Sequence, residues 1–203
     1  AMDDKTGLWV VIEALRRVGL REGDDLLVHS ALQFLGRPIG GVGMYYEALR
    51  AVVGERATLA VPTFNFAFAR GEDYDPINTP SEGMGVFAEY VRALPEARRS
   101  SHPLQSFAFH GPLALELAAL DTPGAFDDGS AFDRMLAADF KLLLLGATIQ
   151  AASAVHYSEQ RAGVPYRYWK DFSGNVRRDG AWQPVTYRMF ARDLARDPQL
   201  ALA

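Results

Sequence analysis

The sequence predicts an α/β fold in one domain over residues 1–203, with a mixed, largely parallel central sheet flanked by helices and a C-terminal antiparallel part. Two observations support this prediction. Over about the first 150 residues, short apolar runs typical of buried strands alternate with segments whose apolar residues recur at helical spacing. After them, β-rich flanks surround the turn dipeptide Asp179-Gly180, which is typical of a hairpin.

Each element of the first half is predicted from a local pattern. A helix over residues 5–18 would place its apolar side chains on one face, namely Leu8, Val11, Ile12, Leu15 and Val18. The run DLLVHS at 25–30 and the run ATLAVPTF at 57–64 are predicted to be buried strands. Between them, residues 43–54 form an amphipathic pattern that ends at a glycine, so we expect a second helix there.

The second half is predicted to hold three helices and one very apolar strand. The helices are expected at residues 85–94, 112–120 and 130–139. Pro112 would occupy the first helical position, and Ser130 would cap the third helix with Asp133 at the capping-box position. The run KLLLLGA at 141–147 is the most apolar strand candidate.

Composition excludes several classes of protein. The formal charge of −4 gives no basic surface for nucleic acid. The absence of cysteine excludes disulfides, thiolate metal sites and a cysteine nucleophile, and we expect no metal. No signal peptide is apparent and no apolar run reaches the roughly 20 residues of a membrane span, so a cytoplasmic protein without membrane contact is expected.

Polar residues gather where the predicted strands end, which is where open α/β sheets bind ligands. His29 and Ser30 end one strand, and a loop with Gly36, Gly40 and Gly41 then leads into a helix. Such a loop lets a ligand approach the backbone, and a helix N-terminus favours anions. The alternative is an ordinary glycine-rich turn, because the loop is neither a P-loop nor a dinucleotide fingerprint.

Two further stretches carry candidate polar groups. Thr63 and Asn65 end the second strand, and taken alone this stretch favours the alternative of a strand that leaves the core through a polar turn. The segment RRSSHPLQSFAFHG at 98–111 holds two histidines, and His102 precedes a proline that favours extended geometry. A solvated, inactive His102 remains the alternative.

His156 and Glu159 follow the very apolar strand and are spaced i, i+3, so they would touch on one face of a helix. A carboxylate beside an imidazole fixes its tautomer and raises its basicity, which prepares a general base. The alternative is a surface ion pair of little energetic consequence.

Taken together, these segments resemble the aminoglycoside 3-N-acetyltransferase family. The resemblance rests on HSALQFLG…GG, AVPTFNF, TPSEGMG, RRSSHPLQSFAFHG, LLLLGA and AVHYSEQRAGVPYR in that order, and covers the chain from His29 onward. It implies the family's own α/β architecture rather than the GNAT fold, acetyl-CoA as cosubstrate and a small amine as acceptor, and it leaves a homodimer open.

The resemblance also implies roles for individual residues. His156 would be the general base, Glu159 its orienting partner, and His102 a neighbour that shapes the site. The cofactor-binding residues would be His29, Ser30, Ala31, Phe34, Leu35, Gly36, Gly40, Gly41, Thr63, Ser100 and Ser106, and the substrate-binding residues Asn65, Asp75 and Glu89. The chain departs from the family pattern at Ala31, where a second serine is common, and at Ser153, where a threonine is common.

Several functions stay open at this point. The acceptor is either an aminoglycoside antibiotic, for which acidic residues such as Asp127 and Asp128 are available, or an amino sugar of cell-surface polysaccharide synthesis. A serine hydrolase using Ser30 or Ser106 is a rival, although the sequence has no GxSxG motif. A non-catalytic coenzyme A-binding protein is another.

Overall fold

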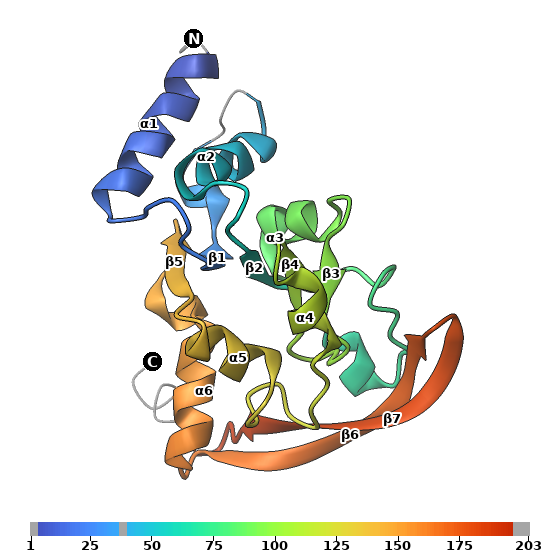
Figure 1. The fold of residues 1–203 in the computed structure, drawn as a ribbon. Coiled ribbons are helices and arrows are strands. Elements are labelled where there is room, and N and C mark those ends of the chain that lie inside the picture. The colour runs from blue at the N-terminus through green and yellow to red at the C-terminus, as the bar shows by residue number, and fades with distance from the viewer. Residues whose placement is uncertain (1–3, 37–39, 197–203) are drawn as a thin grey trace.

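The computed structural model describes residues 4–36 and 40–196, which form a five-stranded sheet with helices around it and a separate two-stranded hairpin (Figure 1). The order of strands in the sheet is β3-β4-β2-β1-β5. The strands are β1 (Leu26–Ser30), β2 (Leu59–Pro62), β3 (Arg98–Arg99), β4 (Phe107–His110), β5 (Lys141–Leu145), β6 (Arg167–Arg178) and β7 (Ala181–Arg192).

The strand directions confirm a mixed, largely parallel sheet. β1 runs parallel to both β2 and β5. β4 is antiparallel to β2 and to β3. Four of the five strands therefore point the same way, and β4 alone is reversed. The C-terminal antiparallel part is the β6–β7 hairpin, whose turn is at Asp179-Gly180 as the sequence predicts.

The helices are α1 (Asp4–Arg17), α2 (Gly43–Val53), α3 (Gly85–Arg92), α4 (Ala114–Ala119), α5 (Ala131–Ala137) and α6 (Ser153–Ala162). Ser130 caps α5 as predicted, because its hydroxyl accepts a hydrogen bond from the Asp133 amide at 3.2 Å. The prediction for Pro112 is wrong. The helix starts at Ala114, because the preceding amide of Leu113 donates to the Thr58 hydroxyl and the Ala114 amide closes a turn onto Gly111.

Alternation along the strands separates two hydrophobic cores. Leu26 and Val28 of β1 face a core shared with α1, α2 and α3. Leu27, between them, faces the core shared with α4, α5 and α6. The sheet is therefore the middle of three layers, because successive side chains of a strand point to opposite faces.

The most apolar strand candidate, at 141–147, is not a fully buried strand. β5 lies at the edge of the sheet and pairs only with β1, so Lys141 and Leu142 are exposed. Composition reports how apolar a strand is, but the order of strands decides how much of it is covered.

The β6–β7 hairpin crosses beneath the loops at one end of the sheet (Figure 1). Tyr74 holds one side of it, since its amide donates to the Asn175 carbonyl at 2.9 Å and its carbonyl accepts from Arg177. On the other side, the Arg188 amide donates to the Pro123 carbonyl at 2.8 Å. A small third core, in which Phe68, Leu104, Val176 and Tyr187 join Tyr74, packs under the hairpin.

Candidate active site

The end of β1 divides the site into two sides. His29 and Ser30 are neighbours in a strand, so their side chains point to opposite faces of the sheet. His29 contacts Ser153 at the start of α6. Ser30 lines a cavity on the face that α2 and α3 cover. Two different functional elements therefore meet at the carboxyl end of one strand, where open α/β sheets bind ligands.

The cavity beside Ser30 has a volume of about 670 Å³. The N-termini of α2 and α3 both open onto it, through Val42 and Gly85. Neither helix has a side-chain cap or an acidic residue in its first turn. Their free amide groups and the positive ends of their dipoles thus remain available to an anion. The other lining residues are Leu32, Gln33, Gly36, Gly41, Tyr45 and Val86.

The glycine loop supplies part of this cavity. Gly36 and Gly41 line it and have φ values of 82° and 68°, in the left-handed region that favours glycine. Phe34 is 75% exposed in the adjoining turn. Leu35 instead lines a second hollow of about 310 Å³ against α1. Residues 37–39 of the loop lie outside the described part of the chain.

Ala31 and Gly40 stand in the same loop without lining the cavity, and Gly146 fixes where Ala31 lies. Gly146 follows β5 with a φ of 71°, and a Cβ atom there would come within 2.8 Å of the Ala31 carbonyl oxygen. The chain can follow this path only with glycine at that position.

The predicted contact between His156 and Glu159 is present on α6. Nδ1 of His156 lies 3.1 Å from Oε2 of Glu159. The Glu159 side chain is 9% exposed and that of His156 is 29% exposed. Within the described residues, Nδ1 of His156 contacts both Glu159 and Arg167. One nitrogen of the imidazole is therefore held in place by charged neighbours.

Arg167, at the start of β6, completes this group. Its Nη2 atom lies 2.7 Å from Oε2 of Glu159 and 3.1 Å from Nδ1 of His156. Burial and the Arg167 charge lower the pKa of His156, although Glu159 acts in the opposite sense. Burial by itself raises the pKa of Glu159, but hydrogen bonds from His156 and Arg167 outweigh burial and lower it.

His29 fastens α6 to the sheet. Its Nε2 accepts a hydrogen bond from the Ser153 amide at 2.9 Å and lies 2.9 Å from the Ser153 hydroxyl. The residue before α6, Ala152, offers no side-chain cap, so this imidazole does the capping from a neighbouring strand. Burial, and then the nearby His156, lower the pKa of His29 to about 4, which keeps it neutral.

His102 lies under the hairpin, with both ring nitrogens engaged. Nδ1 accepts from the Gln105 amide at 3.3 Å, and Nε2 lies 3.3 Å from the Arg188 carbonyl oxygen. The ring packs on Tyr187 with centroids 4.6 Å apart. Burial lowers the pKa of His102 to about 4. Through Arg188 and Tyr187, His102 anchors the hairpin. Its role in catalysis stays a prediction.

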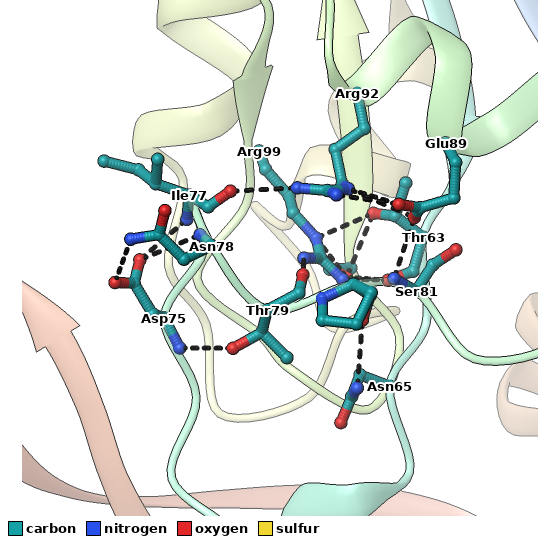
Figure 2. Close-up of polar contacts among 12 residues, drawn as sticks. Thr63, Asn65, Asp75, Ile77, Asn78, Thr79, Ser81, Glu89, Arg92 and Arg99 are labelled. Atoms are coloured by element: carbon teal, nitrogen blue, oxygen red, sulfur yellow. Dashed lines mark hydrogen bonds and ion pairs between the residues drawn. The ribbon is translucent and has the colours of Figure 1, made fainter.

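Thr63 and Ser106 have no exposed area and contact each other at 3.1 Å between their hydroxyl oxygens. The guanidinium of Arg99 donates to both hydroxyls and also to the carbonyls of Thr63 and Thr79 (Figure 2). Ser100 is buried as well, and its hydroxyl accepts from the Phe107 amide. The hydroxyls of these three residues thus have partners within the protein, and their predicted contact with the cofactor stays a prediction.

The predicted substrate residues Asn65, Asp75 and Glu89 also have partners within the chain (Figure 2). The side-chain Nδ2 of Asn65 donates to the Pro80 carbonyl, and its side-chain oxygen accepts from the backbone amide of Ala67. Asp75 accepts from the amides of residues 77 and 78 and from the Asn78 side chain. Glu89 pairs with Arg92 and accepts from the Ser81 amide. All three hold the loop between β2 and α3, and their contact with substrate stays a prediction.

The serine–histidine contact in the structure is not one that the hydrolase alternative uses. Ser106 donates its hydroxyl to the Thr63 carbonyl at 2.7 Å. Ser153 does contact His29, but their exposed fractions are 1% and 3%. A nucleophile must reach its substrate, so this buried pair has a structural role.

None of the helices in residues 4–36 and 40–196 is both long and apolar enough to cross a membrane. Within the same residues, no group of three or more histidine or acidic side chains is placed to hold a metal ion.

Known proteins are similar to this chain in sequence and in fold. Residues 27–199 match the family model of aminoglycoside 3-N-acetyltransferase. The chain is 33% identical over 199 residues to aminoglycoside N(3)-acetyltransferase III of Salmonella sp, covering 87% of this chain and 69% of the relative. It is 33% identical over 187 residues to aminoglycoside N(3)-acetyltransferase VII of Streptomyces paromomycinus, covering 82% of this chain and 64% of that relative.

Solved structures agree. The structure of AAC-VIa bound to sisomicin superposes with a TM-score of 0.77 at 27% identity, covering 89% of this chain and 74% of that one. AAC-IIIb in binary complex with CoASH superposes with a TM-score of 0.80 at 23% identity, covering 91% and 75%, which shows a shared fold. The chain spans 69% of the length of the Salmonella relative and 64% of the length of the Streptomyces relative. By its sequence over residues 27–199 and by its fold, the chain belongs to the aminoglycoside 3-N-acetyltransferase family, whose named members are acyltransferases.

Proposed function

We propose that this chain is an acetyl-CoA-dependent N-acetyltransferase that acts on an amino group of an aminoglycoside or a related amino sugar, with His156 as general base. The observation that carries the proposal is the geometry at the end of β1. The oriented imidazole of His156 lies on α6, whose first residue Ser153 contacts His29, and the cavity of about 670 Å³ lies beside Ser30.

The cavity fits a phosphate-bearing cosubstrate. Ser30, Gly36 and Gly41 would hold its chain, and the uncapped N-termini of α2 and α3 would face its phosphates. One solved structure with this fold is a complex with CoASH, which supports the same choice of cosubstrate. When bound, acetyl-CoA supplies the acetyl group as a reactive thioester.

His156 would take the proton that the acceptor amine loses as its C–N bond forms. An ammonium group has no lone pair for attack, so a base within reach of the amine is required. Glu159 accepts from Nδ1–H of His156, which leaves the lone pair on Nε2. Because burial and Arg167 lower the pKa of His156, the imidazole is already neutral at physiological pH.

The acidic side chains around the hairpin bear on the choice of acceptor. Four aspartates that a polycationic antibiotic could have used are already paired with arginines, in the pairs Asp75–Arg177, Asp121–Arg178, Asp127–Arg188 and Asp128–Arg161. This pairing favours an acceptor with few amino groups, such as a single amino sugar. The names of the relatives and the sisomicin complex favour an aminoglycoside, which we place first.

A panel of amines with acetyl-CoA, followed by release of free thiol, tests the proposal. Aminoglycosides and simple amino sugars are compared at equal concentration. With the best acceptor, His156→Ala is expected to lower turnover by about 10²–10⁴-fold, the usual contribution of a general base. Glu159→Gln should cost less, because the imidazole remains.

Two results would contradict the proposal. Thiol release with none of the amines, in a protein that binds acetyl-CoA, would favour a non-catalytic binding protein. Retention of most activity and of the acidic limb of the pH profile in His156→Ala would show that another group is the base.

A further inference from the structure

One carboxylate oxygen of Glu159 serves two partners. Oε2 lies 3.1 Å from Nδ1 of His156 and 2.7 Å from Nη2 of Arg167, and these two nitrogens are 3.1 Å apart. The side chains of Arg167 and Glu159 are only 7% and 9% exposed. Water therefore screens this triangle of charges poorly.

The triangle restricts the state of the imidazole. A guanidinium has only hydrogen-bond donors, so Arg167 cannot accept a hydrogen bond from Nδ1–H of His156. If Nδ1 accepted from Arg167, a neutral His156 would carry its proton on Nε2 and could not act as a base through that atom. When both nitrogens donate to Oε2, Nδ1 keeps its proton and Nε2 keeps its lone pair.

The position of Arg167 is fixed by the hairpin. Its Nη1 donates to the Phe190 carbonyl on β7 at 3.0 Å, while Nη2 contacts Glu159. One side chain thus joins β6, β7 and α6. A guanidinium held at two points brings a permanent positive charge to the imidazole at a fixed distance.

We propose that Arg167 is a positioning residue for the base: it anchors the Glu159 carboxylate, and its charge beside Nδ1 opposes protonation of His156, so that Nε2 can accept a proton from the substrate. The catalytic consequence rests on the proposed function. The electrostatic consequence for His156 does not.

The charged groups around His156 come from four elements. Glu159 on α6 raises the pKa of His156, whereas Arg167 on β6 and Arg192 on β7 lower it. His29 on β1 is also coupled to His156 and is itself neutral, since its pKa is lowered to about 4. Arg167 contacts both members of the pair, so we choose this cation for substitution.

The test is a titration of the His156 imidazole by NMR in protein with labelled histidine, using His156→Ala to assign the signal. Arg167→Gln keeps hydrogen-bond donors but removes the charge. The midpoint of His156 should move to higher pH in this variant, and to lower pH in Glu159→Gln. Arg161→Gln is the matched control, because it removes an arginine of α6 that pairs with Asp128 instead. Its midpoint should equal that of the wild type.

Activity supplies a second readout. The acidic limb of the kcat/KM profile should shift to higher pH together with the NMR midpoint in Arg167→Gln. If Arg167→Gln does not fold, Arg167→Lys tests the charge alone, and its midpoint should remain at the wild-type value. An Arg167→Gln midpoint that stays in place or falls, or an Arg167→Lys midpoint that rises, would overturn the inference. Shifted midpoints in a protein inactive toward every amine would instead contradict the proposed function and leave the inference standing.

Discussion

Lowering the pH from 7 to 5 is expected to destabilise the fold strongly, because His29 and His102 are buried as neutral imidazoles. Burial is the main reason that the pKa of each is lowered from 6.5 to about 4. The unfolded chain binds protons as the pH falls through 6.5, while the folded chain does not until about pH 4. The stability that these groups contribute is therefore complete above pH 6.5 and is lost between pH 6.5 and pH 4.

The size of the loss follows from these values. Each histidine is expected to remove about 2 kcal/mol of stability between pH 7 and pH 5, so the pair removes about 4 kcal/mol. The pKa values of His110 and His156 are also lowered by burial, and they act in the same direction. Since domains are stable by only about 5–15 kcal/mol, the loss should be easy to measure.

Urea denaturation at pH 7, 6 and 5 measures it, with His102→Gln as the decisive variant. This variant loses the contacts of the ring with Tyr187 and should be less stable at every pH. Its loss of stability between pH 7 and pH 5 should nevertheless be smaller than that of the wild type, by about 2 kcal/mol. A variant with unchanged pH dependence would show that His102 is protonated in the folded protein, and would refute the reasoning from burial.

Two substitutions test local geometry. Ser130→Ala removes the cap of α5 and should cost about 1 kcal/mol in urea denaturation; it should keep the pH dependence of the wild type, which makes it a control for His102→Gln. A loss too small to measure would mean that another group caps the helix. Gly146→Ala should lower the melting temperature and raise the KM for acetyl-CoA, because its Cβ would meet the Ala31 carbonyl at 2.8 Å and displace the glycine loop. An unchanged KM for acetyl-CoA in a destabilised variant would show that Gly146 does not position the glycine loop for cofactor binding.

Local rules predicted the elements well. The Ser130 cap, the Asp179-Gly180 turn and the alternation of strands and helices depend on neighbours in the sequence, so the sequence contains them. The i, i+3 contact of His156 with Glu159 is local in the same sense. Strand order is not local, which is why the exposure of Leu142 on the edge strand was not foreseen.

The missed site residue is Arg167. It follows Glu159 by eight positions in another element, and no helical spacing connects them. The role of Arg99 was missed for a similar reason, since a guanidinium that binds two hydroxyls and two carbonyls cannot be inferred from residue type. Thr63 follows its strand as expected, but only the fold shows that its hydroxyl and that of Ser106 face Arg99.

The hairpin also determines when the chain acquires its complete set of acid–base groups. β6 and β7 follow every strand of the sheet in the sequence, and they are fastened to segments made much earlier; Asp73 and Asn175, which hydrogen-bond, are 102 residues apart. Contacts of such separation form late in folding. Neither α6 nor the five-stranded sheet contains a residue of the hairpin, so they can assemble before Arg167 reaches Glu159. Until the last two strands dock, His156 contacts Glu159 without Arg167, and docking then brings up a positive charge that lowers the pKa of His156.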